Sequence, residues 1–108
     1  MRDTKSPTAT PSSGKVFADL DLPDSDDLMT KAHLALHIRR TIEVRRLTQT
    51  RAAEILGLDQ PKVSAIINGR LEGFSTERLM RLLNDLGCDV QISISPSHPE
   101  TRGHVRVA

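Results

Sequence analysis

Small and polar side chains follow one another along GLDQPKVSAIINGR, residues 57–70, at a spacing that places them on one face of a short helix. An amide can pair bidentately with adenine, a lysine can reach guanine or phosphate, and a hydroxyl can bond several base edges. A methyl side chain lets the helix backbone approach a thymine methyl. We therefore predict that five residues contact base edges in the DNA major groove: Gln60, Lys62, Ser64, Ala65 and Asn68.

A second set of side chains is placed to contact DNA phosphates. Gln49 starts the preceding helix, where free backbone amides and the helix dipole favour an anion. Nearby arginine and threonine side chains are further phosphate donors. The predicted phosphate contacts are Thr48, Gln49, Arg51 and Arg70. The ordinary alternative for every residue of both sets is a solvated polar side chain, and Asp59 is expected to cap a helix.

Two short helices around a tight turn, residues 48–68, must position these groups. Where two helices cross steeply, the contact point admits only a small side chain, and Ala53 supplies it. Gly57, four residues later, can take the positive φ that the turn needs. Val63 and Ile66 then provide the branched apolar anchors of the second helix. This pattern indicates a helix-turn-helix motif, although a helical hairpin can meet the same demands for packing alone.

The flanking elements are predicted from apolar periodicity and capping residues. Apolar residues repeat every four positions in a first helix over about 25–45, with Asp24 placed to cap it. A fourth helix follows the cap Ser75 and ends before Gly87. The fold class is therefore mainly α, a bundle of four to five helices followed by a C-terminal strand.

That strand is predicted over 89–95, DVQISIS, where apolar and polar side chains alternate. Its inward positions are Val90, Ile92 and Ile94. Nothing else in the sequence resembles a partner, and an unpaired strand would leave open backbone groups beside an apolar face. We expect the same strand of a second subunit to pair with it antiparallel in a homodimer. The alternative is that residues 15–20 supply the partner strand within the chain.

Length and charge limit the number of domains and the kinds of partner that the protein can have. With 108 residues the chain suits one small domain, which we divide into a disordered tail over 1–14, a folded region over 15–95 and a flexible tail over 96–108. Only 2% of residues are aromatic, so the core must be aliphatic. Residues 31–86 carry ten Lys and Arg against six Asp and Glu, whereas 1–30 carry three against six. The positive charge thus lies on the folded part and favours a phosphate-bearing partner.

Several other functions are not expected. Cys88 is the only cysteine, which excludes an intrachain disulfide and a cysteine-rich zinc site. His33 and His37 have the spacing of a metal pair, but they lack further ligands nearby, so two surface histidines are the simpler interpretation. No catalytic motif is present, and we expect neither an enzyme nor a cofactor. No apolar run approaches the roughly 20 residues of a membrane span and no signal segment is evident, so we expect a soluble, cytoplasmic protein.

The segments LTQTRAAEILGLDQPKVSAIINGR and FSTERLMRLLNDLGCDVQI resemble the XRE (Cro/repressor-like) helix-turn-helix family, in particular its branch of HigA-type antitoxins. The resemblance covers about residues 15–95. It implies a compact helical domain, often dimeric, that binds operator DNA and represses its own operon. For antitoxin members it also implies a toxin partner, typically a RelE-like ribonuclease that cleaves messenger RNA. The alternative function is a protein-interaction module that keeps the helix-turn-helix shape without contacting bases.

Three residues need attention within this resemblance. Arg46 stands where the family usually has a glycine that ends the first helix, so we expect a strained, left-handed residue there. Ile67 is more often polar in the family. An isoleucine at this position either packs inward under Phe74 or contacts a protein partner. Ile55, which faces out of the second helix, raises the same alternatives.

Overall fold

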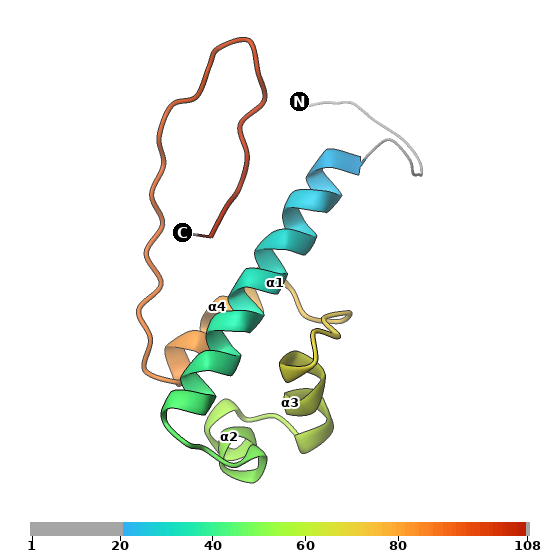
Figure 1. Cartoon of the computed structure of the whole chain (residues 1–108), viewed down its shortest axis with the longest axis vertical. Coiled ribbons are helices and arrows are strands. Elements are labelled where there is room, and N and C mark those ends of the chain that lie inside the picture. The colour runs from blue at the N-terminus through green and yellow to red at the C-terminus, as the bar shows by residue number, and fades with distance from the viewer. Residues whose placement is uncertain (1–20, 108) are drawn as a thin grey trace.

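The part of the chain that the computed structural model describes, residues 21–107, folds as a bundle of four helices, with side chains described from residue 25 onward (Figure 1). The helices are α1 (Asp21–Val44), α2 (Gln49–Leu56), α3 (Gln60–Ile67) and α4 (Thr76–Asp85). Helix α1 contacts α3 and α4, and α2 also contacts both of these helices. Figure 1 shows α2 and α3 gathered at the C-terminal end of α1. The mainly α bundle that the sequence predicts is therefore confirmed.

The start of α1 corrects one prediction. The helix begins at Asp21, four residues before the predicted start, and continues to Val44. Asp24 therefore lies inside the first turn and does not precede the helix as its cap. Pro23 permits the earlier start, because the N–H groups of a first helical turn have no intrahelical partner and a missing one costs little. The predicted tail over 1–14 and the alternative partner strand over 15–20 lie outside the described residues.

The three shorter helices begin where their capping residues predict. In each of them a side-chain oxygen accepts a hydrogen bond from the backbone N–H three residues later, which satisfies one of the free donors of the first turn. The capping residues are Thr48, Asp59 and Ser75, with donor–acceptor distances of 3.0, 3.0 and 3.1 Å. The starts of α2, α3 and α4 are thus fixed by local side-chain chemistry.

Arg46 adopts the left-handed conformation that the sequence predicts for the end of α1. Its φ is 56°, and among the described residues it is the one non-glycine residue with a positive φ. The reversal lets the N–H of Leu47 return to the carbonyl of Ile42 at 3.0 Å, which closes the helix end. The chain then turns directly into the cap of α2, so this strained residue sets how α1 leads into the motif.

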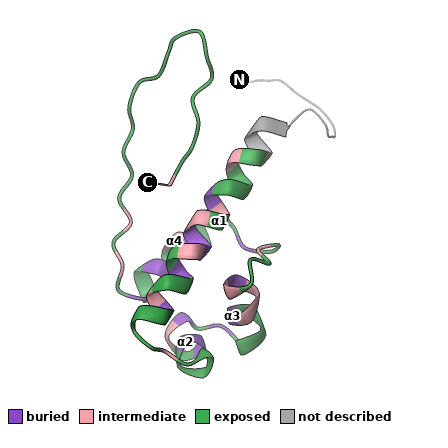
Figure 2. Cartoon of the chain, in the orientation of Figure 1, coloured by how far each residue is buried: buried purple, intermediate pink, exposed green. Residues whose placement is uncertain are grey.

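The core is aliphatic, and all four helices contribute to it (Figure 2). Ile38 of α1 and Leu79 of α4 are each 0% exposed, and the buried residues of α2 and α3 meet them from the other side. Phe74 is the aromatic residue of this cluster, and Thr30 is the buried polar residue among those described. No helix within residues 21–107 combines the length and the apolar character that a bilayer span requires.

Residues 88–98 run extended after α4 and form no paired strand in the single chain. Val90 is half-buried against the core, but Ile92 is 74% exposed and Ile94 is 92% exposed. The predicted buried face of this segment is therefore open along most of its length. Whether it pairs with a second subunit stays a prediction, because the structure contains one chain.

The last residues return to α1 after a turn in which Thr101 N–H donates to the carbonyl of His98 at 3.1 Å. The N–H of Val105 then donates to Asp26 Oδ2 at 3.3 Å, and Nδ1 of His104 lies 3.3 Å from the same oxygen. Val107 packs against the edge of the core. Residues 104–107 thus lie beside the N-terminal half of α1, away from α2 and α3 (Figure 1).

Candidate nucleic-acid interface

Helices α2 and α3 pack through the residues that the sequence assigns to their crossing. Ala53 is buried where the two helices meet, and its carbonyl accepts the N–H of Leu58 at 3.0 Å. Gly57 ends α2 with a φ of 66°, the left-handed value that the tight turn needs. Val63 and Ile66 are buried on the inner side of α3. This geometry confirms a helix-turn-helix, with the small side chain of Ala53 buried on α2 as the sequence predicts.

The predicted base-contacting set lies on the side of α3 that the core leaves open. Three of its members are exposed and two are half-buried. Because Val63 and Ile66 point inward, Ser64, Ala65 and Asn68 lie on the outer face of the helix, and Gln60 and Lys62 lie on its two flanks in the first turn. The exposed members are Gln60, Lys62 and Asn68, and the half-buried members are Ser64 and Ala65.

The side chains at the two ends of α3 are hydrogen-bonded to different partners. At its N-terminus, Nε2 of Gln60 donates to Oγ1 of Thr50 at 3.0 Å, which joins the beginnings of α2 and α3. At its C-terminus, Nδ2 of Asn68 donates to the carbonyl of Ser64 at 2.9 Å and lies 3.3 Å from the Ser64 hydroxyl. The amide nitrogen of Asn68 is therefore hydrogen-bonded within α3. Lys62 makes no ion pair among the described residues and is free to reach outward.

The predicted phosphate-contacting residues flank this face. Gln49 is the exposed first residue of α2, and Thr48 precedes it as the cap. Arg51 makes an ion pair with Glu54 at 3.0 Å, and both side chains are more than half exposed. An exposed pair of this kind is weak, so Arg51 can exchange Glu54 for a phosphate. Arg70 follows α3, is exposed, and makes no ion pair within residues 21–107.

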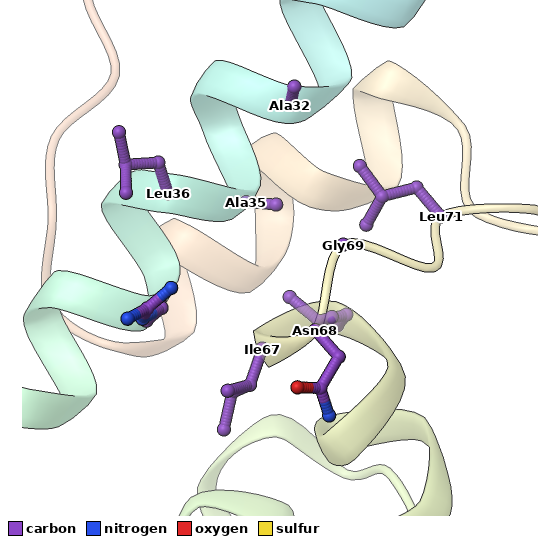
Figure 3. A pocket seen from close by; sticks show the side chains of 9 residues that line it. Ala32, Ala35, Leu36, Ile67, Asn68, Gly69 and Leu71 are labelled. Atoms are coloured by element: carbon purple, nitrogen blue, oxygen red, sulfur yellow. The ribbon is translucent and has the colours of Figure 1, made fainter.

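A groove of about 350 Å³ opens between α1 and the C-terminal end of α3 (Figure 3). Ile67 lines it together with Leu36 and Leu71, and Arg39 and Asn68 also border it. Ile67 is half-buried and packs against the core. Its side chain therefore packs partly against the core and is partly open to the groove. The inward packing and the protein contact that the sequence analysis considered are both compatible with this position. Ile55 on α2 is likewise half-buried against the core.

The other candidate sites have little structural support. His37 is exposed and His33 is half-buried, and the described residues contain no cluster of three His, Cys, Asp or Glu side chains that could hold a metal ion. Cys88 is half-buried and lies 3.5 Å from the hydroxyl of Thr41, as expected of a small filling side chain.

Thr50 is a residue beside the candidate interface that the sequence analysis missed. It is exposed and lies at the second position of α2, ten residues before its partner Gln60. Sequence spacing alone gives no signal for the pair, because the contact depends on the angle between two different helices. The only available hint is that both residues occupy the first turn of a helix of the same motif.

Two comparisons with known proteins find matches, and the first of them spans all four helices. The model of a family described as a helix-turn-helix domain matches residues 16–95. A solved structure described as an XRE family transcriptional regulator is 48% identical to this chain. The match covers 80% of this chain and 96% of the other, with a TM-score of 0.68. No curated protein matches.

Proposed function

Because the chain belongs to the helix-turn-helix family of XRE transcriptional regulators, we propose that it binds operator DNA in the cytoplasm as a sequence-specific repressor of its own operon. The observation that carries the proposal is the solvent-facing side of α3, which presents Gln60 and Lys62 while Val63 and Ile66 hold the helix against the core. A helix in the major groove must present small and polar groups to the base edges, and this face does so.

Helix α2 supports the same orientation. Gln49 is the exposed first residue of α2, where the free backbone amides favour an anion, and Arg51 in α2 and Arg70 just after α3 are exposed cations. The excess of positive charge over residues 31–86 attracts the DNA backbone. The competing function, a protein-interaction module without base contacts, leaves the polar outer face of α3 unexplained.

Gln60→Ala is expected to lower affinity for the native upstream DNA by about 1–3 kcal/mol and to relax base preference at one operator position, as the loss of a bidentate contact does. The measurement is fluorescence anisotropy on duplexes that carry each base pair in turn at each position. Gln91→Ala removes the same amide from an exposed position after α4 and serves as the control. Unchanged affinity and preference would show that Gln60 contacts no base.

Arg70→Ala is expected to weaken binding equally on all DNA sequences and to lower the slope of log affinity against log salt by about 1, as the loss of one phosphate contact does. The affinity is measured between low and physiological salt on operator and unrelated DNA. Arg81→Ala removes an exposed arginine that pairs with Glu77 on α4, and it should leave the slope unchanged. An unaltered slope for Arg70→Ala would place Arg70 away from the phosphates.

We also propose that the chain acts as a homodimer paired through residues 89–95. None of the backbone groups of 89–97 bonds another backbone group within the described chain, and Ile92 and Ile94 leave an apolar edge beside them. Antiparallel pairing of two copies would satisfy the open groups and cover the isoleucines. A dimer would place two copies of α3 on half-sites about 34 Å apart, near one turn of the duplex.

A narrower proposal is that the repressor is also the antitoxin of a RelE-like ribonuclease. Its support is the resemblance to HigA-type antitoxins and the exposed Leu28 and Met29 on α1, an apolar surface away from the helix-turn-helix. A reading frame for a basic protein of about 90–120 residues, the size of one small domain, should then lie beside this gene. Its product should arrest growth alone and lose that effect when co-expressed with this chain. Arrest that persists on co-expression would leave a repressor without a toxin partner.

A further inference from the structure

One hydrogen bond joins the beginnings of the two motif helices at their exposed surface. Gln60 Nε2 donates to Thr50 Oγ1 at 3.0 Å, and both side chains are exposed. The backbone is fixed on both sides of this bond, because Thr48 caps α2 and Asp59 caps α3. The buried crossing at Ala53 sets the position of one helix against the other. Thr50 therefore presents its hydroxyl to Gln60 from a rigid support.

The hydrogen bond leaves Gln60 with a defined set of free groups. A glutamine amide has two N–H donors and one carbonyl acceptor. With one N–H held by Thr50, the other N–H and the oxygen remain, which are the donor and the acceptor that a bidentate contact with adenine N7 and N6 uses. A free glutamine side chain can also rotate and exchange the places of its oxygen and nitrogen. The hydrogen bond to Thr50 instead limits the rotamers of the Gln60 side chain and keeps its amide beside the start of α2 before DNA arrives.

We propose that Thr50 is a positioning residue that holds the side chain of Gln60 in place and thereby sharpens the base preference at the position that Gln60 contacts, with adenine as the preferred base. This inference rests on the proposed DNA-binding function. It assigns to Thr50 no contact with a base of its own. Its effect on DNA is therefore expressed only through Gln60.

The test compares Thr50→Val, which keeps the branched shape and removes the hydroxyl, with Thr50→Ser, which keeps the hydroxyl. Thr50→Val is expected to reduce the ratio of affinities for the preferred and next-best base pair at the Gln60 position by about 3–10-fold, the range of coupling between side chains in contact. Thr50→Ser should retain the ratio within about twofold of the wild-type value, since its hydroxyl can occupy the same place. The melting temperature of each variant should match that of the wild type, because Thr50 is exposed.

A double-mutant cycle separates positioning from an independent contact. In the Gln60→Ala background, Thr50→Val should change the preference at that position no further. An equal loss with and without Gln60 would overturn the inference, because Thr50 would then act on DNA directly. A base preference left intact by Thr50→Val would also overturn it while the proposed function stands. A wild-type chain that binds DNA with no base preference would overturn the proposed function, and this inference with it.

Discussion

Ile92→Lys is expected to convert the protein from dimers to monomers in sedimentation experiments. Ile92 is 74% exposed in the single chain, on an extended segment whose backbone groups have no backbone partners among the described residues. In the proposed dimer its side chain would lie in the apolar face shared by two strands. A lysine there would bring two like charges together across the two-fold axis and leave each of them poorly solvated.

The loss of the dimer should have a large effect on DNA binding. Two linked copies of α3 engage two half-sites at once, and such linkage commonly raises overall affinity by about 10²–10⁴-fold. We therefore expect Ile92→Lys to bind a full operator about 10²–10⁴-fold more weakly than the wild type does. Its affinity for a single half-site should stay unchanged. The comparison needs anisotropy measurements on duplexes with one and with two half-sites.

Gln91→Lys is the matched control for this prediction. It adds the same charge one residue away, on the polar side of the predicted strand. Because neighbouring side chains of a strand point to opposite faces, this lysine should remain in solvent and the dimer should persist. Dimers that survive Ile92→Lys would contradict pairing through this segment, and equal disruption by both variants would contradict the predicted register.

The features that the sequence predicted correctly depend on local chemistry. A serine, threonine or aspartate caps a helix through a bond to a backbone N–H three residues on, so Thr48, Asp59 and Ser75 mark helix starts without any knowledge of the fold. The left-handed Arg46 was expected from the resemblance, because it stands where the family usually has a glycine that ends the first helix. Burial of Ala53 and Val63 followed from the size demands of a steep crossing.

Three features differ from the sequence prediction or were absent from it, and two of them depend on contacts between distant or separate segments. The start of α1 was placed four residues late because Asp24 was interpreted as its cap, whereas the helix already begins at Asp21. The hydrogen bond between Thr50 and Gln60 requires the relative orientation of two helices, which residue spacing does not contain. The strand over 89–95 needs a partner for its hydrogen bonds, so one chain by itself leaves it extended and unpaired.

Ile38→Ala is expected to lower the free energy of unfolding by about 2–5 kcal/mol, the usual cost of removing a large aliphatic side chain from a packed core. Ile38 is 0% exposed and lies on α1 within the cluster to which all four helices contribute. Since small domains are typically stable by about 5–15 kcal/mol, this single cavity should remove a large part of the total. The measurement is chemical denaturation, with Val44→Ala, 81% exposed on the same helix, as the control that should change little.

The same variant separates residues that build the interface from residues that contact DNA. Ile38 lies in the buried core, whereas the predicted interface residues are exposed or half-buried, so the folded fraction of Ile38→Ala should keep the base preference and salt dependence of the wild type. Operator DNA at about 100 times Kd should restore about 2.7 kcal/mol of stability, because it binds only the folded chain. Gln60→Ala should show the opposite pattern, with unchanged melting and altered base preference. An altered base preference in Ile38→Ala would mean that the core sets the orientation of α3, in addition to holding it in place.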